Sequence, residues 1–339
     1  MVVRSQQMMG KDARYIPGWD CHGLPIEWKI EEQYRSKGKN KDDVDIIDFR
    51  QECLKFAACW VESQREEFKI LGVMGKWENP YLTMDFHAER VIAEEFMTFL
   101  MNGTLYQGSK PVMWSPVEKT ALAEAEIEYH DHKSHTIWVA FKIKSASVEI
   151  SKARIVIWTT TPWTIPSNRA IAFNPKISYG LYHVDETSEE SWTAKGDYYI
   201  IADNLASETL EKSRVTKHTR VKDVLSSELK DCVCQHPFSE LDSFWSYDVP
   251  VIDGDHVTDD AGTGFVHTAP SHGADDYECF LKRNWLDRMT HNVGEESEFL
   301  AHVPFFAGLT VFDRKGKEGK ANTEAVSYTH LRAHETLLD

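Results

Sequence analysis

A threonine-rich stretch that contains two prolines is the part of the sequence best suited to bind a polar ligand. Residues 158–168 read Trp-Thr-Thr-Thr-Pro-Trp-Thr-Ile-Pro-Ser-Asn and follow the β-branched run 154–157, which predicts a buried strand. The prolines exclude a regular helix and predict an extended or turned loop. Hydroxyl and amide groups on such a loop can bind a sugar, an adenine edge or an ester carbonyl, although threonines that bond their own backbone are the alternative.

A second polar stretch, residues 260–277, supplies the charge that the first one lacks. Its sequence is Asp-Ala-Gly-Thr-Gly-Phe-Val-His-Thr-Ala-Pro-Ser-His-Gly-Ala-Asp-Asp-Tyr. The two glycines predict a tight turn into a short strand that ends at His267, and a helix is expected to begin at Asp275 or Asp276. Asp275 suffices to cap that helix, which leaves Asp276 free to face a pocket. A third glycine is missing, so the stretch is not a dinucleotide-binding loop.

A metal site and a Ser/His/Asp catalytic triad are minor alternatives for the second polar stretch. His267, His272 and Asp276 have neither a nucleophile elbow nor the spacing of a metal site. Residues 232–236, Cys-Val-Cys-Gln-His, hold three soft ligands but lack the distant second pair that structural zinc needs. On a strand these three side chains would share one face, which packing alone explains. We therefore predict no metal site.

The threonine-rich stretch resembles the corresponding peptide in the editing domain of class I isoleucyl-tRNA synthetases, and the resemblance extends from near the N-terminus to about Ala325. In that family the second stretch closes the editing pocket. The resemblance implies that Asp276 pairs with the amino group of a misattached amino acid and that His267 lines the side-chain pocket. It also implies that the remaining site residues bind the terminal adenosine and orient water, namely Thr159, Thr160, Thr161, Thr164 and Asn168.

Residues 15–28, Tyr-Ile-Pro-Gly-Trp-Asp-Cys-His-Gly-Leu-Pro-Ile-Glu-Trp, form another polar constellation. Glycines and prolines bracket Asp20 and His22 on a constrained turn, and Pro25 suits the first position of a helix. The string resembles the Gly-Trp-Asp-x-His-Gly-Leu-Pro element of the synthetic site of the same family. The resemblance implies that Asp20 holds the α-amino group of isoleucine.

Bulk composition limits the class of protein. The chain has 339 residues, 42% of them hydrophobic and 27% charged, which is typical of a globular protein with room for two cores. It has no apolar run long enough to cross a membrane. Six cysteines without framework spacing favour a reducing, cytoplasmic location. A net charge of −16 argues against a general nucleic-acid coat but permits a local groove for one RNA end.

The predicted elements divide the chain near residue 130. Apolar residues recur with helical period over 42–72 and 86–102, and we assign these aromatic stripes to a core. Asp45 can cap the start of the first helix, and Gly72 and Gly103 can end the two helices. A short helix is expected at 121–125, and short strands then dominate, at 136–143, 154–157, 177–184, 198–202, 249–252 and 264–267. Helices are expected near 205–212 and 275–283. The predicted class is α/β: a partial Rossmann-type catalytic domain over 1–130, then a β-rich, barrel-like inserted editing domain over 131–325.

The ends of the chain indicate a fragment. The His-x-Gly-His and Lys-Met-Ser-Lys-Ser motifs, which bind ATP in the family, do not occur. Residues 326–336 resemble the translation of a sequencing-library adapter, so we treat 326–339 as a non-native tail.

The resemblance therefore implies a fragment of an isoleucine-tRNA ligase that retains hydrolysis of valyl-tRNA. It further implies tRNA for isoleucine as partner, isoleucine and valine as ligands, a monomer, and ATP with Mg²⁺ as cofactor of the full-length enzyme only. The family's zinc site is not expected in this chain. A stand-alone aminoacyl-tRNA deacylase and a non-catalytic module that binds tRNA ends are the alternatives.

Overall fold

The computed structural model describes residues 1–131, 133–189, 191, 193–313 and 316–329. The chain forms two compact units, residues 1–108 and 109–339. This division falls earlier than the composition shift near residue 130, and the domain limits drawn from that shift remain a prediction. Within the described residues, no helix combines the length and the apolar character needed to cross a lipid bilayer.

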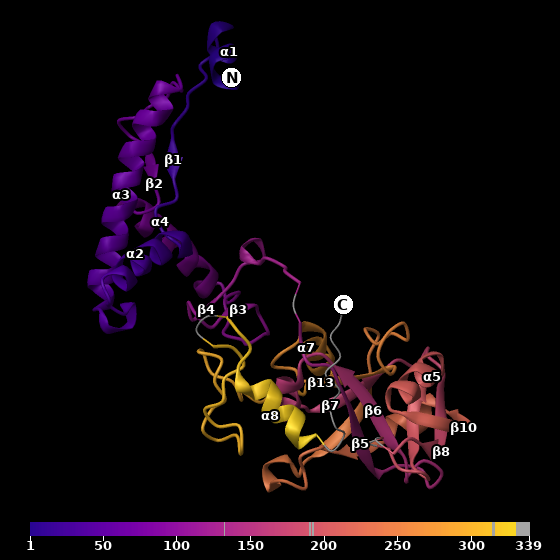
Figure 1. Cartoon of the computed structure of the whole chain (residues 1–339). Coiled ribbons are helices and arrows are strands. Elements are labelled where there is room, and N and C mark those ends of the chain that lie inside the picture. The colour runs from indigo at the N-terminus through magenta and orange to yellow at the C-terminus, as the bar shows by residue number, and fades with distance from the viewer. Residues whose placement is uncertain (132, 190, 192, 314–315, 330–339) are drawn as a thin grey trace. The chain divides into compact units, whose positions relative to one another are not determined.

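The first unit is built from helices and one short parallel strand pair (Figure 1). Strand β1 (Gly18–Trp19) pairs with β2 (Tyr81–Leu82). The helices are α1 (Val2–Met8), α2 (Leu24–Ser36), α3 (Ile46–Ile70) and α4 (Phe86–Met101), with a 3₁₀ turn η1 at Lys41–Asp43.

The ends of the two long helices lie where the sequence predicted them. Asp45 caps α3 by accepting a hydrogen bond from the backbone N–H of Ile47 at 2.8 Å, and Gly72 follows the helix at a φ of 76°. Asp85 caps α4 in the same way, and Gly103 follows it at a φ of 77°.

The core predicted for these helices is wrong for this chain. The apolar stripe of α4 at Ile92, Phe96, Phe99 and Leu100 is exposed, and α4 contains no buried residue. On α3 the buried residues are Ala57 and Val61, whereas Trp60 lies outside the core. Periodicity identifies the apolar face of a helix, but burial needs a partner element, and the described part of unit 1 offers only a small cluster around Cys21.

The second unit is organised around a nine-stranded mixed sheet in the order β10-β8-β9-β6-β5-β11-β12-β7-β13. The strands are β5 (Ile137–Ser145), β6 (Arg154–Thr159), β7 (Ala170–Phe173), β8 (Tyr179–Thr187), β9 (Tyr198–Ala202), β10 (Val215–Val224), β11 (Val233–Gln235), β12 (Asp248–Asp253) and β13 (Phe265–Thr268). A separate hairpin pairs β3 (Trp114–Ser115) with β4 (Thr120–Ala121). Terminal strand β13 also contacts β6 in the middle of the order, which brings the sheet back over itself as expected for a barrel-like domain.

Short helices connect the strands. They are α5 (Asp203–Lys212), α6 (Ser226–Lys230), α7 (Ala274–Leu281) and α8 (Lys320–Tyr328), with 3₁₀ turns η2 (Glu124–Glu126), η3 (Pro162–Ser167), η4 (Ser243–Trp245) and η5 (Leu286–Arg288). The helix expected at 121–125 is thus only the turn η2, whereas the helices α5 and α7 agree with prediction. Of the nine strands of the sheet, β7, β10 and β11 were not predicted.

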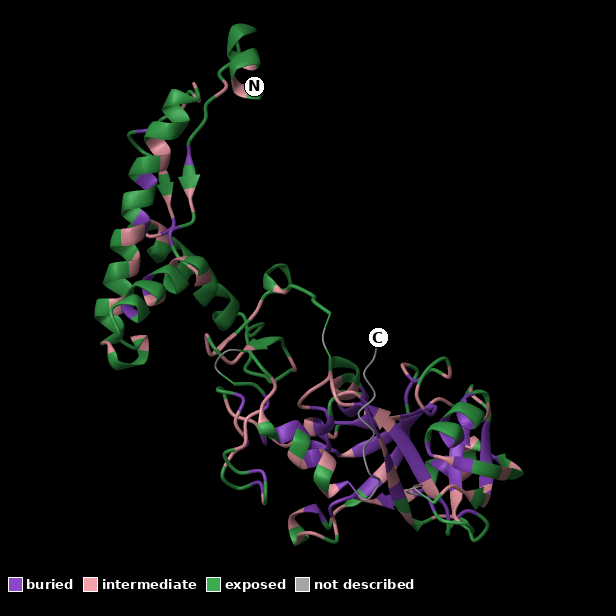
Figure 2. Cartoon of the chain, in the orientation of Figure 1, coloured by how far each residue is buried: buried purple, intermediate pink, exposed green. Residues whose placement is uncertain are grey.

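The core lies on and between these strands, which are the main buried elements in Figure 2. Its largest cluster runs from Ile137 to Ala325 and includes Phe141, Phe238 and Trp245, all fully buried. Helix α8 packs on η3 and extends into the segment interpreted as a tail, because Val326 and Tyr328 pack against this core. The rest of that segment, 330–339, lies outside the described residues.

Candidate functional site

The two polar stretches meet around one cavity of about 180 Å³. We call it the threonine cavity. The first stretch contributes Trp158, Thr159, Thr161 and Thr164 to its lining. The second contributes Val266, His267, Ala269, His272 and Asp276. The meeting follows from the fold, because β13 contacts β6 and α7 follows β13 directly.

The threonine-rich loop is more regular than its prolines suggested. Residues 162–167 form the 3₁₀ helix η3 with Pro166 inside it, so the expectation of an extended or turned backbone is wrong there. A 3₁₀ helix tolerates this composition because it is short and Pro162 occupies its first turn. The helix turns Thr164 inward, where it is 6% exposed.

The three consecutive threonines have different surroundings. Thr159 is buried, and its Oγ1 accepts the backbone N–H of Thr161 at 3.1 Å. Thr161 is exposed at the mouth, with its Oγ1 3.1 Å from that of Thr159. Thr160 does not line the cavity; its carbonyl accepts a hydrogen bond from Ser134. The structure thus brings Thr159 and Thr161 to the cavity but not the side chain of Thr160.

His267 is held by a directional chain of hydrogen bonds. The amide nitrogen of Asn168 donates both to the carbonyl of Ala170 and to Nδ1 of His267, each at 2.9 Å. Because Nδ1 accepts, Nε2 carries the proton and donates to Oγ1 of Thr164 at 2.7 Å. Oγ1 of Thr164 then donates to the carbonyl of Thr161 at 2.8 Å. Burial lowers the pKa of His267 to about 3, and nearby His272 adds to the effect.

His267 and Asn168 lie in different places relative to the cavity. His267 contributes to the wall of the cavity, whereas Asn168 is fully buried behind it and is not part of the lining. Both nitrogens of His267 make hydrogen bonds within the protein, so this neutral ring shapes the wall of the cavity. It has no free nitrogen for proton transfer.

Asp276 is the charged group of the cavity. Its Oδ2 accepts the backbone N–H of Ala269 at 2.8 Å, which folds the first turn of α7 back onto the end of β13. Burial raises the pKa of Asp276 to about 6; the bond from Ala269 lowers it, and the charge of Asp275 raises it. The carboxylate is therefore costly to ionise when the cavity is empty, and an opposite charge placed there would relieve this cost.

The capping role predicted for Asp275 is wrong. The N-cap of α7 is Gly273, and no side chain caps that end. Asp275 lies one position inside the helix and is exposed, so its contribution is a negative charge in the first turn. Asp276 faces the cavity, as the sequence interpretation required.

The sequence indicated only a minor alternative role for His272 and gave no signal for Ser167 or Asn292. Nε2 of His272 lies 3.2 Å from Oγ of Ser167, which accepts a hydrogen bond from the amide nitrogen of Asn292 at 3.0 Å. Ser167 and Asn292 are fully buried. The ring of His272 also packs edge-on against Trp163 at 4.8 Å. No sequence signal links a lone serine to a histidine 105 positions away or to an asparagine 125 positions away.

The Cys-x-Cys-x-His segment is structural. Cys232 and Cys234 are buried in the core around β11. Nδ1 of His236 accepts the backbone N–H of Phe238 at 3.1 Å, and Nε2 donates to the carbonyl of Ile165 at 2.9 Å. Among the described residues no group of three or more His, Cys, Asp or Glu side chains could hold a metal ion. His236 therefore supports η3 from behind.

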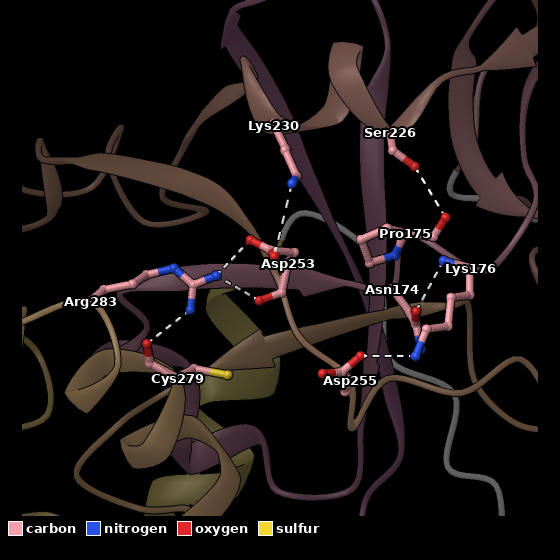
Figure 3. Close-up of polar contacts among 9 residues, drawn as sticks. All are labelled: Asn174, Pro175, Lys176, Ser226, Lys230, Asp253, Asp255, Cys279 and Arg283. Atoms are coloured by element: carbon pink, nitrogen blue, oxygen red, sulfur yellow. Dashed lines mark hydrogen bonds and ion pairs between the residues drawn. The ribbon is translucent and has the colours of Figure 1, made fainter.

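A cleft of about 650 Å³ is lined by α7 and by the segments that follow β7 and β12. Figure 3 shows the polar contacts of residues around it. Arg283 donates to the carbonyl of Cys279 at 2.9 Å and to both the carbonyl and the carboxylate of Asp253 at 2.7 Å. Lys176 pairs with Asp255 at 3.3 Å across the same cleft. The Arg283 contacts tie the end of α7, the helix that carries Asp276, to the end of β12, and the Lys176–Asp255 pair joins the segments that follow β7 and β12.

Asp20 belongs to unit 1. It is exposed directly after β1. The next residues are fixed by Thr83, whose Oγ1 accepts the backbone N–H of Cys21 at 2.8 Å and lies 3.1 Å from Nδ1 of His22. The turn predicted around Asp20 is therefore held in place, while the role of its carboxylate remains a proposal.

Comparisons with known proteins identify the family of this chain. The family model "tRNA synthetases class I (I, L, M and V)" matches residues 1–235. An isoleucine-tRNA ligase of Ruegeria pomeroyi is 54% identical over 96% of this chain and 34% of its own length. One of Rhodopseudomonas palustris is 51% identical with the same coverage. A leucyl-tRNA synthetase editing domain of P. falciparum covers 48% of this chain and 72% of its own, with a TM-score of 0.34 and 10% identity.

The family model covers the whole of the helical unit and continues into unit 2 as far as the end of β11. This chain belongs to the class I tRNA synthetases. Among the curated relatives it is similar to isoleucine-tRNA ligases, and it spans about a third of their length.

Proposed function

We propose that this chain carries the editing site of an isoleucyl-tRNA synthetase and hydrolyses the ester of valine misattached to the tRNA for isoleucine. The observation that carries the proposal is the threonine cavity, where the threonine-rich loop and Asp276 converge. An aminoacyl ester presents a cationic ammonium, a polar ribose and an ester carbonyl. The cavity offers a carboxylate, threonine hydroxyls and a neutral histidine wall in the same space.

Asp276 is the residue that we assign to the ammonium group. Its pKa of about 6 lies below neutral pH, so most molecules hold a carboxylate there at pH 7. A bound ammonium would stabilise that charge further through a charge-assisted hydrogen bond. The attraction between the two charges thereby offsets the free-energy cost of desolvating the carboxylate of Asp276.

The hydroxyl groups of Thr159 and Thr161 are assigned to the ribose and to the attacking water. Their Oγ1 atoms lie 3.1 Å apart, and both residues line the cavity. Hydrolysis of an activated ester needs no protein nucleophile; a positioned water and stabilisation of the developing oxyanion are sufficient. Thr164 and Asn168 act behind this layer, because their polar atoms hold His267. We assign no role in chemistry to the side chain of Thr160.

A second site is needed because isoleucine and valine differ by one methylene. This pair is the usual illustration of how little a single binding pocket can discriminate between two amino acids. Burial of one CH₂ contributes only about 1 kcal/mol, and up to about 3 kcal/mol in a tight pocket. A site too small for isoleucine can remove valine after attachment. The wall formed by His267 and Val266 is where we place that size limit.

The activity of the whole protein is part of the same proposal. It would ligate isoleucine to its tRNA with ATP and Mg²⁺, act as a monomer in the cytoplasm, and hold the α-amino group of isoleucine at Asp20. Editing itself requires none of the ATP chemistry.

The test is deacylation of valyl-tRNA that carries the isoleucine anticodon, with the 339-residue chain and with isoleucyl-tRNA as the matched substrate. We expect release of valine well above the spontaneous rate and little release of isoleucine. A folded chain that leaves both esters at the spontaneous rate would overturn the proposal. Equal release from both would contradict the size limit at His267.

A further inference from the structure

We propose that His272 is a catalytic residue of the threonine cavity, and that its Nδ1–H donates a hydrogen bond to the carbonyl oxygen of the bound ester. This inference rests on the proposed function and adds the group that stabilises the oxyanion. Three observations carry it: the position of His272 in the cavity lining, the hydrogen bonds of Ser167, and the contrast with His267.

The tautomer of His272 follows from hydrogen-bond accounting at Ser167. Asn292 donates from its amide nitrogen to Oγ of Ser167 at 3.0 Å and to the carbonyl of Pro166 at 3.3 Å, which fixes the orientation of the amide. Ser167 is 1% exposed, so its hydroxyl proton needs a protein acceptor. Within the described residues, Nε2 of His272, at 3.2 Å, is the remaining partner. Nε2 therefore accepts, and the proton of the neutral ring is on Nδ1.

That proton has no protein partner among the described residues, although the side chain lines the cavity. His267 differs, because Asn168 and Thr164 engage both of its nitrogens. Of the two histidines in the lining, only His272 can offer a hydrogen bond to a ligand. Edge-on packing against Trp163 restricts its ring, so the donor is oriented before the ligand arrives.

The ring remains neutral near physiological pH. Burial, together with nearby His291, lowers the pKa of His272 to about 4. A neutral imidazole that donates through N–H is an electrophilic group rather than a base. It suits a site in which Asp276 already provides the negative charge for the ammonium end of the ligand.

Water hydrolyses the ester by addition and elimination. The oxygen of a water molecule forms a bond to the ester carbonyl carbon, and the carbonyl π electrons move to the oxygen that accepts the Nδ1–H hydrogen bond. Collapse of this tetrahedral species re-forms the carbonyl and breaks the bond to the ribose oxygen. The ribose oxygen leaves with the electron pair and receives the proton lost by the water. His272 keeps its proton throughout.

Two amide substitutions separate the proposed donor from a structural role. The amide nitrogen of Asn is as many bonds from Cβ as Nδ1 of His, and that of Gln as many as Nε2. We expect His272→Gln to lower kcat for valyl-tRNA by about 100-fold with little change in KM, as removal of an oxyanion donor does. His272→Asn should stay within about tenfold of the wild type. The matched control is His218→Gln on β10, at the opposite end of the strand order from β13.

A second measurement reads the tautomer without activity. Long-range ¹H–¹⁵N correlation spectra of the histidine-labelled chain should show His272 protonated at Nδ1 and His267 at Nε2. Ser167→Ala removes the hydroxyl and should release this preference, with a smaller loss of kcat than His272→Gln.

The outcomes separate the two proposals. A wild type that hydrolyses valyl-tRNA together with an unaffected His272→Gln would overturn this inference alone. An Nε2–H tautomer of His272 in the free protein would also overturn it. If the wild type is inactive, the proposed function fails, and the spectrum still decides the tautomer.

Discussion

Nε2 of His267 donates a hydrogen bond of 2.7 Å to Oγ1 of Thr164, across 103 positions of the chain. This bond joins β13 to η3 and closes the wall of the threonine cavity. Its strength comes from its surroundings, because both side chains are more than 90% buried and neither atom can turn to water.

The first prediction concerns this bond. Thr164→Val keeps the shape of the side chain but leaves the Nε2–H of His267 unpaired in the interior. We expect the free energy of unfolding to fall by about 1–3 kcal/mol, measured by urea denaturation. Thr160→Val is the matched control for stability, because Thr160 is only partly buried and lies outside the cavity lining. Equal losses in the two variants would show that the bond contributes nothing specific.

The second prediction tests the glycines that turn the chain into β13. Gly264 has a φ of +79°, and a Cβ there would lie 2.3 Å from Cβ of Ala202. Gly308 has a φ of +78° with nothing within 4 Å, so Gly308→Ala carries only the backbone strain. We expect Gly308→Ala to cost about 1 kcal/mol and Gly264→Ala about 1–3 kcal/mol more. Thermal unfolding of the two variants measures the difference, and similar midpoints would contradict it.

The third prediction concerns acid stability. Burial lowers the pKa of His236 to about 3, from an unfolded value near 6.5. The unfolded chain therefore binds a proton that the folded chain does not, so stability is lost as the pH falls below about 6.5 and the loss continues to about 3. Between pH 6.5 and 5 this one group costs about 2 kcal/mol.

The variant His236→Gln removes this contribution and is compared with the wild type by urea denaturation at each pH. Its free energy of unfolding should depend less steeply on pH, by about 1.4 kcal/mol per pH unit below pH 6. His130, which is exposed, provides the control as His130→Gln. An unchanged slope in His236→Gln would show that this ring is accessible to protons in the folded state.

Much of the fold follows from local sequence patterns. The β-branched run at 154–157 became β6, and Asp45 and Gly72 delimited α3, because these signals act within a few residues. Strand β10 was missed because its residues alternate weakly: most of the side chains from Thr216 to Asp223 are exposed or partly exposed at the edge of the sheet. An edge strand of this kind is specified by its partner β8 rather than by its own pattern.

Part of the site could also be predicted from local sequence patterns. Both polar stretches could be recognised in the sequence, and the structure places Asp276 in the cavity and Asp275 outside it. Their bonding partners could not be predicted, because Ser167 and Asn292 act through contacts across 125 positions. The aromatic face of α4 was predicted from a strong pattern but is not buried. Burial depends on a partner element, which the pattern of one helix does not describe.

The fourth prediction concerns the cost of Asp276 to stability. Its folded pKa of about 6 lies above the ordinary value of 3.8, so the folded chain binds this proton more tightly than the unfolded chain. The contribution of Asp276 to stability is therefore favourable at low pH and is lost as the pH rises through about 6. We expect Asp276→Asn to unfold at a higher temperature than the wild type at pH 7, and to lose this advantage at pH 4. A lower midpoint at pH 7 would contradict it.

The last prediction uses the same carboxylate for function. If Asp276 must be ionised to hold the ammonium group, kcat/KM for deacylation of valyl-tRNA should rise about tenfold from pH 5 to 7, with a midpoint near 6, after division by the spontaneous rate at each pH. Asp276→Ala should slow the reaction at least tenfold, because a charge-assisted hydrogen bond contributes about 1.5–3 kcal/mol. Asp275→Asn should retain the activity and shift the midpoint downwards, since the charge of Asp275 helps to raise the pKa of Asp276. Loss of hydrolysis in Asp275→Asn with an intact Asp276→Ala would reverse the two assignments, and indifference to both would remove Asp276 from the mechanism.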